Sequence, residues 1–112
     1  MTPEDLIRIR HMLDAVKEVR AFTIDKCRED LDNNRMLTLA IIKDLEIIGE
    51  AATKLTPEFK AAQAHIPWAD IIGMRNRLTH GYFDIDLDRV WDTVLEDLGP
   101  LSIDLEKYLN RE

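Results

Sequence analysis

One stretch of the sequence gathers the side chains that could do acid–base chemistry at a phosphate. Two arginines, an asparagine, a histidine and a tyrosine fall within eight positions, in the run Arg75-Asn76-Arg77-Leu78-Thr79-His80-Gly81-Tyr82. Arginine offers a planar fork of donors that matches an anionic phosphate. Histidine takes up or releases a proton near neutral pH. Together these residue types suit chemistry on a phosphate.

Helix geometry decides whether Arg75 and His80 can act together. Five residues along an ideal helix turn the chain by about 500°, which leaves the two side chains about 140° apart. They converge only if the helix ends near His80, and Gly81 favours such an end because glycine readily takes the left-handed conformation. The alternative is a helix C-terminus whose Arg75 and His80 simply favour the negative end of the helix dipole.

The motif and its flanks resemble the HEPN superfamily, and within it the HepT-like toxins, once catalogued as a domain of unknown function. The hallmark of those toxins is Arg, four residues, His, one residue, Tyr, which Arg75, His80 and Tyr82 match. The resemblance covers nearly the whole chain, with agreement at Leu45-Glu46-Ile47-Ile48-Gly49-Glu50-Ala51, Pro67-Trp68, Ile71-Ile72-Gly73-Met74, Ile85-Asp86 and Val90-Trp91.

The resemblance implies a metal-independent endoribonuclease without a cofactor, the toxin of a type II toxin–antitoxin pair. The RNA would supply its own nucleophile, the ribose 2′-hydroxyl. His80 would assist proton transfer and Arg75 would stabilise the crowded phosphate. Asn76 and Arg77 are candidates for positioning the substrate. Asn76 could instead cap backbone groups at the helix end, and Arg77 could be a solvated side chain.

The resemblance also implies two protein partners. The reaction uses a base and an acid, and HEPN ribonucleases supply both by dimerising, so we expect a symmetric homodimer with His80 of both chains near its axis. The second partner would be a minimal nucleotidyltransferase antitoxin that transfers a nucleotide to Tyr82 (AMPylation) and so blocks the site. Alternatively, Tyr82 is an ordinary half-buried aromatic side chain without a role in modification. The alternative function is a non-catalytic HEPN companion that holds substrate for, or scaffolds, a nucleotidyltransferase.

Length and composition indicate one all-α domain over residues 1–112. The 112 residues are 46% apolar, and glycine and proline are scarce at four each. The net charge of −7 argues against a general nucleic-acid coat, which needs many cationic contacts to phosphates. It leaves room for a small basic site, and for a protein partner with a basic face.

Several features favour the cytoplasm. No apolar run is long enough to span a membrane. The start, Met1-Thr2-Pro3-Glu4-Asp5, lacks the basic and apolar regions of a signal peptide. The single Cys27 cannot form an internal disulfide.

Apolar periodicity predicts a compact antiparallel bundle of four main helices plus one short helix. The first should run from an N-cap at Thr2 to about Glu29 and be followed by a polar turn. The second, from about Arg35 to Leu55, is apolar over most of its circumference and should be the most buried. The remaining signals are a cap at Thr56-Pro57 for a short helix over 58–63, a motif helix that opens at Ile66-Pro67, and a last helix capped by Asp86 and kinked at Gly99-Pro100.

Glu46 and Glu50 share one face of the second predicted helix with Lys43. No His or Cys accompanies them at ligand spacing, so we expect no metal site. Either the two carboxylates are solvated, or they pair with Arg75 or Arg77 and position the site. His11 and His65 have no motif around them and are interpreted as surface residues.

Overall fold

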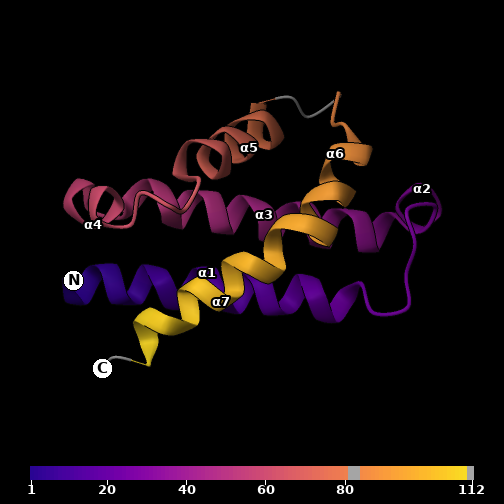
Figure 1. Cartoon of the computed structure of the whole chain (residues 1–112). Coiled ribbons are helices and arrows are strands. Elements are labelled where there is room, and N and C mark those ends of the chain that lie inside the picture. Colours follow the sequence, from indigo (N-terminus) through magenta and orange to yellow (C-terminus); the bar gives the residue numbers. More distant parts are fainter. Residues whose placement is uncertain (81–83, 111–112) are drawn as a thin grey trace.

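The computed structural model describes residues 1–80 and 84–110, and within them every regular element is helical (Figure 1). This confirms the all-α prediction. The elements are α1 (Pro3–Phe22), α2 (Asp30–Asn33), α3 (Arg35–Lys54), α4 (Pro57–Ala62), α5 (Trp68–His80), α6 (Leu87–Asp92), the π-helical segment η1 (Thr93–Asp97) and α7 (Leu98–Leu109). No helix in these residues combines the length and the apolar content that crossing a membrane requires.

Three predicted helix starts are confirmed by their capping side chains. In each, a side-chain oxygen at the N-cap accepts a hydrogen bond from the backbone N–H of the third helical residue. The caps are Thr2 for α1, Thr56 for α4 and Asp86 for α6, at donor–acceptor distances of 3.0, 3.2 and 3.1 Å.

The predicted end of the first helix near Glu29 is wrong, because α1 stops at Phe22. The Thr23 hydroxyl donates to the carbonyl of Val19 at 2.9 Å, and Asp25 takes the left-handed conformation with φ of 60°. Short polar side chains offer the backbone these local alternatives to a helix. The expected polar turn that follows holds a short helix, α2.

α3 lies between α1 and α5, and α7 crosses α1 (Figure 1). This arrangement agrees with the expected central position of α3. Its burial is less complete than its apolar circumference predicts, because Met36 is 84% exposed and Leu39 is 47% exposed. The core is formed mainly by aliphatic side chains from α1, α3 and α7, which include Ile9, Met12, Val16, Ile41, Leu45, Ala52, Leu101 and Leu105.

The last helix runs continuously through Gly99 and Pro100 and changes direction before them (Figure 1). Because Pro100 has no N–H, a regular α-helix would leave the carbonyl of Glu96 without its donor four residues on. The π-helical segment η1 comes just before, where the N–H of Leu98 donates to the carbonyl of Thr93, five residues back. The predicted kink is therefore a π-helical turn.

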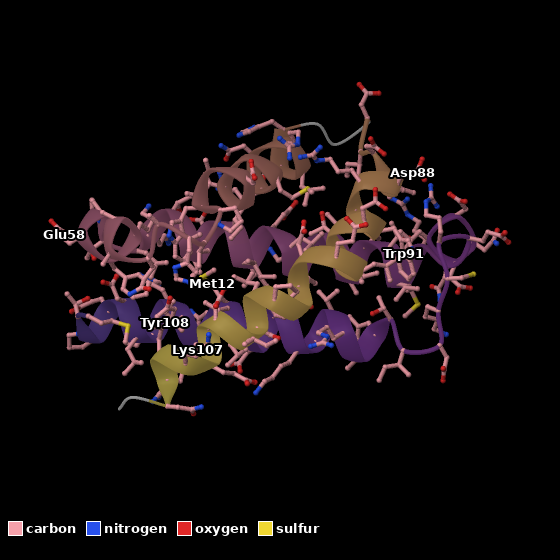
Figure 2. All side chains as sticks on the ribbon, viewed as in Figure 1. Met12, Glu58, Asp88, Trp91, Lys107 and Tyr108 are labelled. Carbon is pink, nitrogen blue, oxygen red and sulfur yellow. The ribbon has the colours of Figure 1, made fainter. Side chains whose placement is uncertain are left out.

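An aromatic cluster fixes the start of α5 between α4 and α7. The ring of Phe59 lies 5.3 Å from Tyr108 in an edge-on contact and 6.2 Å from Trp68. Gln63 joins both partners, since the Trp68 indole donates to its carbonyl at 3.1 Å and the Tyr108 hydroxyl donates to its side chain at 2.7 Å. Figure 2 shows Tyr108 on α7, facing the interior of the bundle. The helix that carries the motif is thus anchored at its N-terminus.

Candidate functional site

Helix α5 carries most of the motif residues. It includes Arg75, Asn76, Arg77 and His80, whereas Gly81 and Tyr82 lie outside the described residues. His80 is exposed in the last turn of α5. Since Arg75 and His80 both lie within the helix, their side chains leave it about 140° apart. Among residues 1–80 and 84–110, no hydrogen bond or ion pair joins the two.

The guanidinium of Arg75 is held by two acceptors. One Nη lies 2.6 Å from a carboxylate oxygen of Glu50 on α3, and the other donates to the Asn76 side chain at 2.9 Å. The Arg75 side chain is 27% exposed, so part of the group remains open to an anion from solvent. The Arg75 side chain therefore points toward α3 and contacts the side chain of Asn76.

Gly49 lets Arg75 lie directly on α3. A Cβ atom built at Gly49 would overlap the Cβ of Arg75 and stand 2.8 Å from its Cγ, and it would lie 3.2 Å from the carbonyl oxygen of Ile71. Any side chain at this position would push α5 away. The close crossing of α3 and α5 at Gly49 thus determines where the Arg75 guanidinium sits.

Arg75 forms part of a polar groove of about 390 Å³ that lies between α1, α3 and α5, called here the basic groove. Of the residues that the structure describes, four cationic side chains line it against two carboxylates, in a chain whose net charge is −7. This reversal of charge makes the groove suited to an anion. The lining residues are Arg8, His11, Lys43, Glu46, Ile47, Glu50, Ala51, Lys54, Arg75 and Thr79.

The two candidate carboxylates of α3 have different surroundings. Glu50 pairs with Arg75 and also with Lys54, at 3.4 Å, so the expected pairing with a motif arginine holds for Glu50. Glu46 is half-buried in the same groove and forms no ion pair with any described residue. No three His, Cys, Asp or Glu side chains in residues 1–80 and 84–110 are grouped in a way that could hold a metal ion.

Sequence reasoning missed Arg8 and His11 as parts of this site. His11 is exposed, as expected, but it lies in the groove that contains Arg75. The available signal was the spacing of three between Arg8 and His11, which places them on one face of α1. That spacing does not reveal that this face lies beside Lys43 and Arg75, because the packing of α1 on α3 is tertiary information.

Arg77 points to a different part of the molecule. It lines a hollow of about 220 Å³ together with Asp84, Asp86 and Arg89. Two residues along a helix correspond to about 200° of rotation, so Arg75 and Arg77 face nearly opposite directions. Within one chain, the structure does not bring Arg77 to the basic groove.

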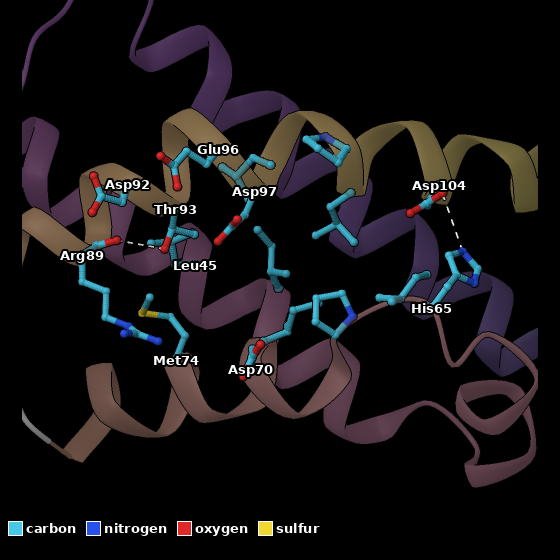
Figure 3. A pocket seen from close by; sticks show the side chains of 17 residues that line it. Leu45, His65, Asp70, Met74, Arg89, Asp92, Thr93, Glu96, Asp97 and Asp104 are labelled. Carbon is cyan, nitrogen blue, oxygen red and sulfur yellow. Dashed lines mark hydrogen bonds and ion pairs between the residues drawn. The ribbon is translucent and has the colours of Figure 1, made fainter.

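A larger groove of about 460 Å³ opens between α5 and the α6–η1–α7 helix, called here the acidic groove (Figure 3). Figure 3 shows Asp92, Glu96 and Asp97 along one side and Asp70 on the facing helix. Within residues 1–80 and 84–110, five carboxylates line it against one guanidinium, over an apolar floor that includes Leu45, Ile48, Ile71, Met74, Leu98 and Leu101. This charge would repel a phosphate, so the basic groove is the candidate anion site.

Comparison with known proteins identifies the family. The family described as "Ribonuclease HepT-like" matches residues 12–110. The chain belongs to the HepT-like family. A Thermococcus cleftensis protein named "Probable ribonuclease HepT" is 35% identical over 99 residues, which cover 88% of this chain and 90% of the relative. A "Putative RNase" of Caldanaerobacter subterraneus is 33% identical over 107 residues, which cover 92% and 96% of the two chains.

A third relative is longer than this chain. A Methanocaldococcus jannaschii protein named "Gamma-glutamylcyclotransferase and putative RNase" is 34% identical over 103 residues. The alignment covers 92% of this chain and 46% of that protein, so the chain spans about half its length. No solved structure gave a significant match. The HepT-like match includes Arg75, His80 and Tyr82, whereas Arg8 and His11 precede it.

Proposed function

We propose that this HepT-like protein is a metal-independent endoribonuclease and the toxin of a type II toxin–antitoxin pair. The family is one of ribonucleases, which supports RNA as the substrate. The observation that carries the proposal is the half-buried Arg75, held by Glu50 at the edge of a groove that concentrates positive charge on an acidic protein.

In the proposed reaction the RNA provides the nucleophile. The ribose 2′-oxygen attacks the adjacent phosphorus, a new P–O2′ bond forms, and the P–O5′ bond breaks. A base takes the 2′-hydroxyl proton and an acid gives a proton to the leaving 5′-oxygen. The products are a 2′,3′-cyclic phosphate and a 5′-hydroxyl end. Arg75 stabilises the charge that grows on the phosphate oxygens in the transition state.

The proposal requires a homodimer. Each chain has a single motif histidine, and His80 leaves α5 in a different direction from Arg75. Two chains related by a twofold axis can supply one His80 as base and the other as acid in one cleft, with Arg75 of either chain at the phosphate. Asn76 orients Arg75 through the hydrogen bond at 2.9 Å.

The partner of this toxin is proposed to be a minimal nucleotidyltransferase antitoxin that modifies Tyr82. An adduct at Tyr82, two residues after His80, would place negative charge beside the site and repel RNA. Co-expression with such an enzyme should raise the intact mass of the wild type by one nucleotide monophosphate. The mass of a Tyr82→Phe variant should stay unchanged.

The test of the nuclease is RNA cleavage in EDTA by the wild type beside His80→Ala, after intact mass has confirmed that Tyr82 is unmodified. Cleavage should survive EDTA, vanish in the variant and leave cyclic phosphate ends. Failure of the unmodified wild type to cut a broad set of cellular RNAs would contradict the proposal.

The acidic groove is the observation that favours a second function, a non-catalytic companion of a nucleotidyltransferase. Its carboxylate rim and apolar floor suit a protein with a basic face better than a nucleic acid. Induced expression separates the two functions. A nuclease toxin should arrest growth only while Arg75 and His80 are intact, whereas a companion should be indifferent to both substitutions.

A further inference from the structure

We propose that the basic groove binds the sugar–phosphate backbone of single-stranded RNA beside the phosphate held by Arg75, with Arg8 of α1 and Lys43 of α3 as the phosphate contacts. The inference rests on the proposed function for the identity of the nucleic acid. It adds a binding surface on α1 and α3 that lies outside the motif.

Arg8 and Lys43 are cations that the fold leaves without a carboxylate partner among the described residues. Acidic residues outnumber Lys and Arg by 22 to 15 in this chain. The described cations that do pair with a carboxylate are Lys17, Arg28, Lys54, Arg75 and Lys107. Arg8 and Lys43 form no ion pair with any described residue, although Glu46 and Glu50 line the same groove. Both therefore remain available to an external anion.

The basic groove is continuous across three helices. Arg75 stands on α5, Lys43 on α3 and Arg8 on α1, and one hollow of about 390 Å³ joins them. A strand with one phosphate at Arg75 would therefore continue toward cations on two further helices. A basic groove that tracks the backbone in this way is the usual surface for sequence-tolerant binding of single strands.

The dimensions of the basic groove bear on the strand state of the RNA. Proteins recognise double-stranded RNA by contacts across successive grooves of the duplex, which require a broad surface. The basic groove is small and is lined by side chains from three adjacent helices. Among the described residues that line the groove, His11 has the one ring, and a base splayed from a single strand can stack on it.

The experiment measures binding without cleavage. A labelled single-stranded RNA of random sequence, with every 2′-hydroxyl methylated so that it cannot be cut, is titrated with full-length protein at several salt concentrations. The test variant is Arg8→Ala/Lys43→Ala. The control is Lys17→Ala/Lys107→Ala, which removes the same charge from side chains that are 60% and 62% exposed and lie outside the groove. Thermal unfolding establishes that both variants fold.

The test variant should bind the RNA roughly tenfold more weakly than the wild type, and the steepness of its salt dependence should fall by about 1.4, or about 0.7 per lost phosphate contact. The control should retain the wild-type salt dependence. Equal affinity and equal salt dependence for the two variants would overturn the inference. It would also be overturned if Arg8→Ala/Lys43→Ala weakened the binding of duplex RNA more than the binding of single-stranded RNA.

This experiment distinguishes a failure of the proposed nuclease activity from a failure of the proposed RNA binding in the basic groove. If the wild type binds the methylated RNA through Arg8 and Lys43 but does not cut unmodified RNA, the groove is an RNA site and the nuclease is refuted. If the wild type cuts RNA but the groove variant binds as tightly as the control, the nuclease stands and the groove is refuted.

Discussion

At the scale of single residues, Glu50 determines the orientation of the Arg75 guanidinium and its availability to a phosphate. It holds one Nη of Arg75 at 2.6 Å and competes with a phosphate for that guanidinium. Glu50→Gln should therefore lower KM for RNA, because Arg75 no longer has a charged competitor. It should also lower kcat, roughly ten- to hundredfold, because Arg75 loses its fixed orientation. Steady-state cleavage kinetics would measure both constants.

The matched control for Glu50→Gln is Glu58→Gln, an exposed carboxylate on α4 at the other end of the bundle from α2 (Figure 2). Its kinetics should equal those of the wild type. Glu50 is half-exposed, so the stability of Glu50→Gln should change little. If kcat and KM were both unchanged, Glu50 would not position Arg75.

Asp44 gives a pH-dependent prediction at the same scale. Burial, the negative charge of Glu18 and a hydrogen bond with Glu18 together raise the pKa of this carboxyl from its ordinary value to about 6. The folded protein thus binds more protons than the unfolded chain between about pH 4 and pH 6, so Asp44 makes the fold less stable as pH rises through that window.

Asp44→Asn should remove this penalty because an amide carries no charge. Near pH 7.5 the variant should be more stable than the wild type by about 3 kcal/mol, and near pH 4 the difference should fall below about 1 kcal/mol. Urea unfolding at the two pH values would measure it. The exposed Asp14→Asn should show no such pH dependence. A wild type that is the more stable protein at pH 7.5 would contradict the raised pKa of Asp44.

At the scale of helices, the crossing of α3 and α5 is set by one glycine. Gly49→Ala places a methyl group against the stem of Arg75, so α5 must shift. We expect a loss of about 1–3 kcal/mol in stability, together with loss of RNA cleavage, because Arg75 moves away from Glu50. Thermal unfolding and cleavage rates would show both effects.

Gly99→Ala is the control for that substitution, since a Cβ at Gly99 meets no atom within 4 Å outside its chain neighbours and its own helix backbone. The higher helix propensity of alanine is offset by the contact of its Cβ with the following Pro100, so this variant should keep its activity and lose less stability than Gly49→Ala. Equal behaviour of the two variants would show that the helix crossing tolerates a side chain at Gly49.

The sequence predicts the helices better than it predicts how they end. Capping by Thr2, Thr56 and Asp86 follows from local chemistry and is confirmed. The early end of α1 depends on a hydrogen bond from Thr23 and a left-handed Asp25, which apolar periodicity does not report. The kink before Pro100 was predictable from its missing N–H, whereas its form as a π-helical turn was not.

Some residues of the candidate site could be predicted from the sequence, and others could not. The motif identifies Arg75, and the shared face of Glu46 and Glu50 suggests a partner for it, which the ion pair of Glu50 bears out. Arg8 and His11 join the site only through the packing of α1 on α3, and no local pattern in the sequence states which faces of two helices meet. Long-range packing was therefore the missing information.

At the scale of the whole molecule, α5 separates two grooves of opposite charge. The basic groove lies on its α1 and α3 side, and the acidic groove lies on its α6–η1–α7 side (Figure 3). This separation reconciles a net charge of −7 with the proposed RNA substrate, because an acidic protein can still attract RNA to one local surface. It also leaves a second surface for a protein partner with a basic face.

A cleft shared in the proposed dimer would make the two chains interdependent. The native mass should be twice the 13.0 kDa of one chain. A heterodimer of one wild-type and one His80→Ala chain, purified through two different tags, should have little more activity than the His80→Ala homodimer, since one cleft needs both imidazoles. Independent sites would instead leave about half of the wild-type activity. A tagged heterodimer of wild type with Lys17→Ala should be fully active, which separates the loss of a shared catalytic group from an effect of tagging.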